Sequence, residues 1–199
     1  MKNRTDFLYG LKIMYRLFIG LEVPPAQQRQ LELLAKASRG HESPIQEKLA
    51  QWVNAPNFHL TLRAIGMVDG VVADHVHEAL SQIKITPFSL TIKGVGQFAQ
   101  AGLIHTLWAG VEKNLALMAL QKKISTTMDR LGIDYGRRHY APHITLAHFR
   151  EGVAPEAIIP FLEQQHLLEL PRFGVENIAL FQSFPHREGA YYKVLWRYQ

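Results

Sequence analysis

Two stretches of the chain, APNFHLTLRA at residues 55–64 and YAPHITLAHF at residues 140–149, repeat one short pattern. In each, a histidine stands two residues before a threonine, and an aliphatic residue follows both, which gives His59 with Thr61 and His143 with Thr145. Successive side chains of a β-strand point to opposite faces, so each histidine shares a face with its threonine. Both stretches are therefore predicted to be strands that bury an aliphatic face and present an imidazole beside a hydroxyl.

The rest of the chain predicts that one supersecondary unit is built twice. Apolar periodicity and turn residues predict helices after Pro24 and over about 71–84, 114–131 and 155–165, and strands at 15–23, 58–68, 87–98, 103–111, 143–149, 171–183 and 190–198. After each motif the order is strand, helix, strand, strand, and Trp108 and Trp196 fall at similar distances beyond the two histidines. This repetition indicates two similar lobes rather than a solenoid of many short units.

We therefore expect an α+β fold that is bilobal with pseudo-twofold duplicated lobes. Each lobe is predicted to be an antiparallel sheet flanked by helices, and the two motif strands should face each other across a central cleft. Residues 14–199 form a single bilobal domain in this prediction, with the motifs at 59–62 and 143–146, and residues 1–13 form an N-terminal extension.

Composition narrows the chemistry that the protein can perform. With 199 residues, 47% of them hydrophobic and 20% charged, the chain is predicted to fold rather than to stay disordered. The absence of cysteine excludes disulfides, a thiolate nucleophile and cysteine-rich zinc sites, and fits a cytoplasmic protein. A formal net charge of +5 favours anionic partners such as nucleic acid or nucleotides. No stretch approaches the roughly 20 apolar residues that cross a bilayer, so no membrane association is expected.

The repeated motif suits the transfer of protons around a phosphate. Displacement at phosphorus needs a base to activate the nucleophile and an acid to protonate the departing oxygen, and two histidines can divide these tasks near neutral pH. Threonine hydroxyls can hold the non-bridging oxygens. No metal ion or other cofactor is then required.

A structural explanation of these residues has to be weighed against the functional one. Either histidine alone is more simply a hydrogen-bonded side chain on a half-buried strand, and either threonine alone reflects strand propensity. Because two such motifs stand at the start of the same repeated unit, the functional explanation is favoured over the structural one.

The sequence resembles the 2H phosphoesterases, and within them the RNA 2′,3′-cyclic phosphodiesterases, also called 2′-5′ RNA ligase-like proteins. The segments that carry the resemblance are YRLFIGLEVP, NFHLTLRAIG, PFSLTIKGVGQF, LWAGVE, RRHYAPHITLAHF and YYKVLWRY. The resemblance implies hydrolysis of a 2′,3′-cyclic phosphate at an RNA end to a 2′-phosphate by a monomeric enzyme. It makes His59 the proton donor and His143 the proton acceptor, with Thr61 and Thr145 binding the phosphate.

Residues just before the second motif also match that family. It often places a basic residue and an aromatic there, which assigns Arg137 or Arg138 to a phosphate oxygen and Tyr140 to a nucleobase. A solvated basic turn is the alternative for both arginines. Gln51 departs from the arginine that relatives frequently carry. His148, five residues after His143, is expected to face away from it.

Other histidines of the chain are assigned no function. His75 and His77 diverge on a predicted helix, and Pro142 interrupts the spacing of His139 and His143, so neither pair is expected to bind metal.

Other functions stay open from the sequence alone. A 2H enzyme could act on a small cyclic nucleotide or an ADP-ribose cyclic phosphate, and a non-catalytic RNA- or nucleotide-binding module could keep the same groups. Reversible 2′-5′ ligation of RNA is implied by the family name, but water should compete in dilute solution.

Overall fold

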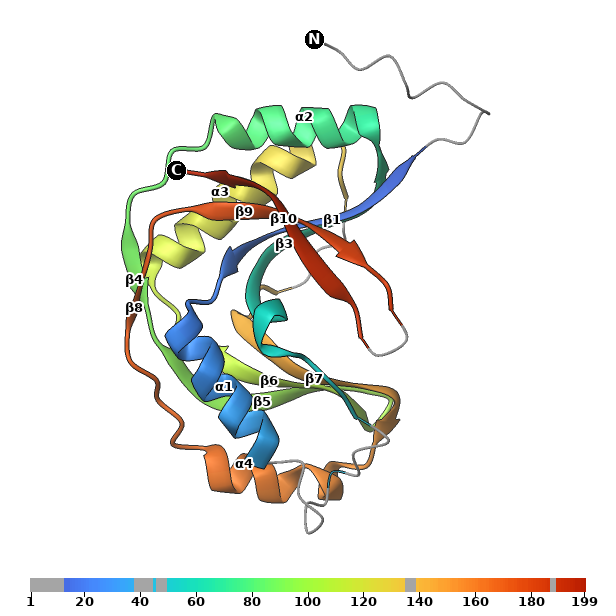
Figure 1. Ribbon diagram of the computed structural model, residues 1–199, viewed down its shortest axis with the longest axis vertical. Helices are drawn as coiled ribbons and strands as arrows, with labels where there is room; N and C mark the ends of the chain where they lie inside the picture. Colours follow the sequence, from blue (N-terminus) through green and yellow to red (C-terminus); the bar gives the residue numbers. More distant parts are fainter. Residues whose placement is uncertain (1–12, 38–44, 46–49, 135–138, 187–188) are drawn as a thin grey trace.

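A computed structural model describes residues 13–37, 45, 50–134, 139–186 and 189–199, so the predicted extension lies almost wholly outside the described residues. The α+β prediction is confirmed (Figure 1). The elements are β1 (Met14–Glu22), α1 (Pro25–Ala37), β2 (Ala50–Trp52), the 3-10 helix η1 (Ala55–Asn57), β3 (His59–Asp69), α2 (Gly70–Ser81), β4 (Phe88–Leu90), β5 (Ile92–Gln100), β6 (Leu103–Val111), α3 (Leu115–Arg130), β7 (His143–Val153), the 3-10 helix η2 (Pro155–Ala157), α4 (Ile159–Gln165), β8 (Phe173–Val175), β9 (Ile178–Phe184) and β10 (Tyr191–Tyr198).

The main sheet is antiparallel and has the strand order β10-β9-β1-β3-β7-β6-β5, while β4 and β8 form a separate pair. Its two halves, β9-β1-β3 and β5-β6-β7, meet where Leu60 of β3 pairs with Ile144 of β7. Beyond that pair β3 continues beside β1, whereas β7 pairs with the short strand β2. The motif strands therefore lie side by side and then diverge (Figure 1), rather than facing each other as predicted.

The repeat begins one strand earlier than the sequence indicated. Gly20 of β1 pairs with Thr61, and Trp108 of β6 pairs with Thr145, so β1 and β6 are the equivalent strands. The predicted correspondence of Trp108 with Trp196 is wrong, because Trp196 belongs to the edge strand β10 and is 41% exposed. Each half takes its third strand from after the helix that follows the other half's motif, an interleaving that local patterns do not reveal.

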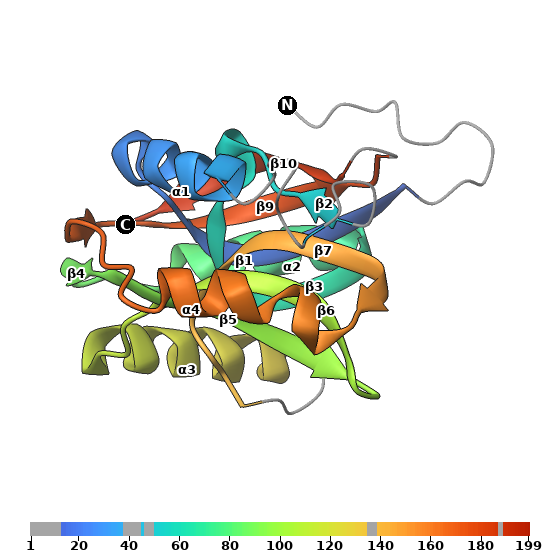
Figure 2. The same ribbon diagram turned by 90° about the horizontal axis from the view of Figure 1, so that it is seen from below.

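The helices lie on the outside of the sheet (Figure 2). α2 contacts β1, β3 and β10, α3 contacts β3, and α4 contacts β5. Two of them begin with a capping side chain, because Asp69 accepts from the Val72 N–H and Asn114 from the Leu117 N–H. At Asp69–Gly70 the chain passes directly from the strand β3 to the helix α2. None of the helices that the structure describes is long and apolar enough to cross a membrane.

A β-bulge follows the threonine of each motif. The extra residue is Leu62 in β3 and Leu146 in β7. A bulge leaves ladder groups unpaired, and here other donors satisfy them. The Leu62 carbonyl accepts from Nε2 of Gln121 at 3.3 Å, and the Leu146 carbonyl accepts from the Val53 N–H at 2.9 Å. Val53 directly follows β2, so its bond to Leu146 holds β2 beside β7. With three residues, β2 is too short to be predicted from the sequence.

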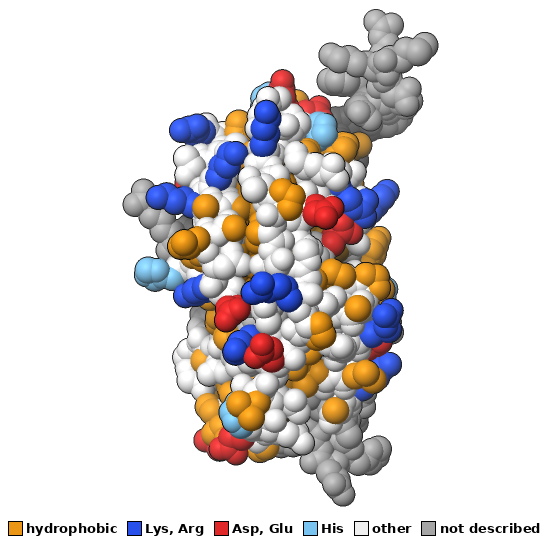
Figure 3. All heavy atoms as spheres, turned by 90° about the vertical axis from the view of Figure 1, so that its left-hand side faces the viewer, with side chains coloured by type: hydrophobic (Ala, Val, Ile, Leu, Met, Phe, Trp, Pro, Cys, Tyr) orange, Lys and Arg blue, Asp and Glu red, His pale blue; other side chains and the backbone are white. Residues whose placement is uncertain are grey.

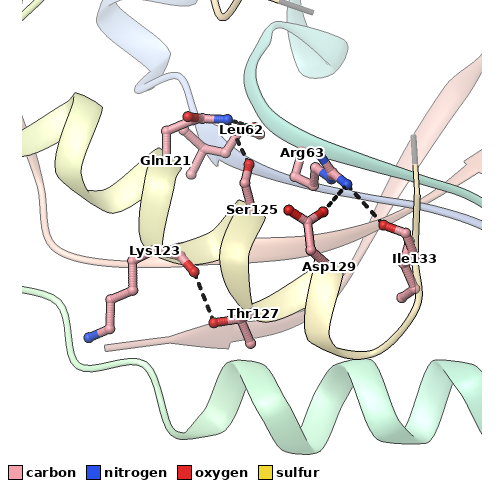
Figure 4. Close-up of polar contacts among 8 residues, drawn as sticks. All are labelled: Leu62, Arg63, Gln121, Lys123, Ser125, Thr127, Asp129 and Ile133. Carbon is pink, nitrogen blue, oxygen red and sulfur yellow. Dashed lines mark hydrogen bonds and ion pairs between the residues drawn. The ribbon is translucent and has the colours of Figure 1, made fainter. Parts of the chain in front are cut away.

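The bulge in β3 also turns Arg63 toward α3 (Figure 4). Its Nη2 lies 2.7 Å from a carboxylate oxygen of Asp129 and donates to the Ile133 carbonyl at 2.9 Å. Gln121, which bonds the bulge, also donates to Ser125 at 2.8 Å. These contacts fix the outer face of β3 to the helix and leave the histidine face unobstructed.

Glycine at position 96 of β5 makes room for the Trp108 ring beside the second motif. A Cβ at Gly96 would overlap that ring, so Gly96→Ala should lower the free energy of unfolding by about 1–3 kcal/mol. Gly174 of β8 has no atom within 4 Å of a built Cβ, and Gly174→Ala serves as the control. Urea denaturation of both variants measures the difference, and equal stabilities would contradict the packing described here.

Candidate active site

The two motif histidines lie on adjacent strands and are oriented in the same way. Nδ1 of His59 lies 2.7 Å from the carbonyl oxygen of Asn57, and Nδ1 of His143 lies 2.7 Å from that of Ala141. A carbonyl only accepts, so Nδ1 carries the proton in both rings. Nε2 is then the nitrogen that each neutral ring offers to a ligand.

The threonines share the face of the histidines, as predicted. Nε2 of His59 lies 3.1 Å from Oγ1 of Thr61, whose hydroxyl donates to the unprotonated nitrogen. The antiparallel register around Leu60 and Ile144 also brings Thr145 beside His59 and Thr61 beside His143 at this point of the sheet. The two histidines and the two threonines therefore share one face of the sheet at this point.

His59 is enclosed by aromatic rings. The centroid of its ring lies 4.6 Å from that of Phe18, 4.8 Å from that of Tyr192 and 5.7 Å from that of Phe181. Burial lowers the pKa of His59 from 6.5 to about 4, and this outweighs the bond to Asn57. The positive charge that His143 and His148 would carry lowers it further.

His143 has an aromatic surrounding from the other half of the sheet. Phe98 meets it edge-on with ring centroids 4.8 Å apart, and the centroid of Trp108 is 6.1 Å away. Burial lowers the pKa of His143, and the bond to the Ala141 carbonyl opposes that effect. The unliganded site thus holds both imidazoles neutral at neutral pH.

The expectation that His148 faces away from His143 is wrong. The extra residue Leu146 reverses the alternation of β7, so the exposed side chains continue at His148 instead of Ala147. Burial lowers the pKa of His148, and the positive charge that His143 would carry lowers it further. The equivalent position of β3 is occupied by Ala64, so the third histidine has no counterpart in the first half.

A pocket of about 400 Å³ opens beside the histidines, between β7, the β2–η1 segment and the β9–β10 hairpin. Its walls include Trp52, Asn54, Asn57, His148, His186 and Tyr192. Gln51, which departs from the family pattern, also lines it. Two of these residues, Asn57 and Tyr192, contact His59 directly, so the pocket lies next to the residues that surround the His59 ring.

Of the remaining predicted residues, Tyr140 does not line this pocket. Arg137 and Arg138 lie outside the described residues. Tyr140 lines a different pocket of about 620 Å³ with Arg63 and His139, against α3. Burial raises the pKa of its hydroxyl. Its contact with a nucleobase stays a prediction.

Within the described residues, no group of three or more His, Asp or Glu side chains is arranged to hold a metal ion. His77 instead contacts the Tyr198 hydroxyl at 2.9 Å. On the face that carries β4 and β8, basic side chains are interspersed with acidic and apolar ones (Figure 3), so the net positive charge does not gather there.

The lowered pKa of His59 predicts a loss of stability in mild acid. Between pH 6.5 and about pH 4 the unfolded chain binds a proton that folded His59 does not, so the free energy of unfolding falls as the pH is lowered, by roughly 3 kcal/mol from this group. His59→Asn lacks the titration and keeps an amide donor for the Asn57 carbonyl. Urea unfolding of both proteins at pH 7 and pH 4 should show a smaller loss in the variant. Equal losses would contradict the assignment.

Known proteins are similar to this chain in sequence and in fold. An RNA 2′,3′-cyclic phosphodiesterase of Aeropyrum pernix is 29% identical over 145 residues, which cover 72% of this chain and 82% of that protein. One of Thermotoga maritima is 28% identical over 192 residues, covering 92% and 95%. The crystal structure of Escherichia coli LigT complexed with 3′-AMP superposes with a TM-score of 0.72 at 22% identity, covering 93% of this chain and 97% of LigT.

The match extends to a whole family. The model of the 2′-5′ RNA ligase superfamily matches residues 23–183, which include both motifs, the bulges and all but the last residue of β9. The resemblance inferred from the motif segments is thereby confirmed. The chain belongs to the 2′-5′ RNA ligase superfamily.

Proposed function

We propose that this protein hydrolyses 2′,3′-cyclic phosphates at RNA ends to 2′-phosphates, with the two motif histidines as acid and base and without a metal ion. The observation that carries the proposal is the pair of imidazoles on adjacent strands, each with Nδ1 fixed by a main-chain carbonyl, so that Nε2 is the nitrogen left to exchange protons with a substrate. The name shared by the relatives, RNA 2′,3′-cyclic phosphodiesterase, supports RNA as the substrate.

In this mechanism Nε2 of His143 removes a proton from water, and the oxygen of that water bonds to phosphorus. The bond from phosphorus to O3′ breaks, and His59 gives its Nε2 proton to O3′, which leaves the phosphate on O2′. Thr61 and Thr145 donate to the non-bridging oxygens, whose negative charge grows as water attacks. Both motifs present the same pair of groups, so the division between donor and acceptor rests on the resemblance to the family.

A proton donor must be protonated when it acts, and the pKa of about 4 leaves His59 neutral at neutral pH. A bound phosphate carries a negative charge, and an anion within about 4–6 Å favours the protonated imidazole. Binding of the substrate therefore raises the pKa of His59 and favours the protonated ring that the mechanism needs. This coupling would restrict the protonated state to the complex.

The pocket beside His59 is the proposed site of the terminal nucleoside. Its ribose carries the cyclic phosphate and must lie next to the group that protonates O3′. The pocket adjoins His59 through Asn57 and Tyr192, and its aromatic and amide side chains can stack on a base and bond its edges. Small cyclic nucleotides are the alternative substrates, because the same pocket would hold their base. Reverse 2′-5′ ligation would use the same groups.

Substitution of the histidines tests catalysis. His59→Ala and His143→Ala should each lower kcat on an oligonucleotide that ends in a 2′,3′-cyclic phosphate by about 10²–10⁴-fold, because each removes a proton-transfer group. His75→Ala, on α2, is the control. The product should carry a 2′-phosphate, and EDTA should leave the rate unchanged. A non-catalytic binding module would show no turnover in any of these proteins, and inhibition by EDTA would refute the metal-free mechanism.

Filling the pocket tests its assignment to the nucleoside. Asn54 is an exposed residue of the pocket wall, and Asn54→Trp should raise KM about 10-fold, the loss of roughly 1.4 kcal/mol of binding, with kcat little changed. Gln164→Trp, an exposed position on α4, is the matched control. Steady-state kinetics on a mononucleotide and an oligonucleotide cyclic phosphate provide the comparison. An unchanged KM in Asn54→Trp would place the nucleoside elsewhere.

A further inference from the structure

One asparagine joins the loop before the first motif to the C-terminal hairpin. The side-chain amide of Asn57 donates from Nδ2 to the carbonyl of Ala190 at 3.2 Å, and its Oδ1 accepts from the Tyr192 N–H at 3.2 Å. The amide thus bonds the main chain of the hairpin at two points, as a neighbouring strand would. The two segments are separated by more than 130 residues of sequence.

The same residue holds the reactive imidazole through its main chain. The carbonyl of Asn57 accepts the Nδ1 proton of His59 at 2.7 Å. Tyr192, whose main chain the Asn57 amide binds, presses its ring edge-on against His59 at 4.8 Å and against Phe18 at 5.2 Å. Asn57, Tyr192 and His59 therefore all contact one another. The Asn57 carbonyl bonds His59, the Asn57 amide bonds the main chain of Tyr192, and the Tyr192 ring packs against His59.

The second motif has no residue equivalent to the Asn57 amide, although its histidine is bonded to a main-chain carbonyl in the same way. Ala141 occupies the position of Asn57 and offers the carbonyl for His143, but its methyl side chain cannot bond another segment. The rings beside His143 come from Phe98 and Trp108, on strands of its own half of the sheet. The anchoring of the β9–β10 hairpin by an asparagine side chain is thus a feature of the half that carries His59.

We propose that Asn57 is a positioning residue for His59: its carbonyl sets the tautomer, and its side-chain amide fixes the ring by anchoring the β9–β10 hairpin against it. The inference rests on the proposed function only for its catalytic consequence. Loss of the amide leaves the Asn57 carbonyl in place but releases the Tyr192 ring. His59 then gains rotational freedom and contact with water, and its Nε2 is no longer held toward the phosphate.

The first test compares Asn57→Ala with Asn114→Ala in the full chain. Asn114 also bonds at two points, accepting from the Leu117 N–H at 2.8 Å and donating to the Ser89 carbonyl at 3.1 Å, but it caps α3 away from the site. NMR titration of the His59 ring should show its pKa moving from about 4 toward 6.5 in Asn57→Ala only. On the RNA substrate kcat should fall about 10–100-fold with a smaller change in KM.

Two further variants keep the inference falsifiable. Asn57→Asp retains an acceptor for the Tyr192 N–H and should keep part of the lost kcat, even if the alanine variant folds poorly. Tyr192→Leu removes the ring but leaves the main-chain bond, so it should raise the His59 pKa while ring nitrogen shifts still report a proton on Nδ1.

The outcomes separate the inference from the proposed function. An unchanged His59 pKa and kcat in Asn57→Ala, as in Asn114→Ala, would overturn the positioning role. If the wild-type protein does not hydrolyse the RNA, the proposed function fails, and the titration still decides whether Asn57 positions the ring.

Discussion

The arrangement of the site depends on the main-chain pairing of Leu60 with Ile144. Both side chains are almost fully buried, with 2% and 0% exposure, and the aliphatic residues of both motifs belong to one core. Because alternate residues of a strand point to opposite faces, burying these aliphatic groups forces the histidines and threonines to the other face. Hydrophobic burial on one side of the sheet therefore assembles the polar groups on the other.

The bulges explain how one repeated motif produces an asymmetric site. Each adds a leucine after the threonine and reverses the alternation, and the freed carbonyl is satisfied by a helix side chain in one half and by the chain after β2 in the other. The reversal brings His148 to the histidine side of β7 and Ala64 to the same place in β3. The pocket lies on the His148 side, so a ligand meets two unlike halves despite the repeated motif.

Aromatic enclosure sets the protonation of the site at the expense of stability in acid. The rings around His59 exclude water and disfavour its charged form, and the bond from Nδ1 to a carbonyl only partly offsets this. A phosphate supplies the missing charge, so the features that keep the empty site neutral also make its protonation respond to an anion. Anchoring the hairpin through Asn57 keeps one of these rings in place.

The sequence by itself determined the α+β class, most of the elements, and the sharing of a face by each histidine and its threonine. These follow from the alternation of apolar residues, which acts within one strand or helix. Only the tertiary structure decided the strand order, the pairing with β2, the orientation of His148, the pKa of His59 and the link from Asn57 to the hairpin. Each of these depends on a bulge or on contacts between residues far apart in the chain, and local periodicity carries no information about either.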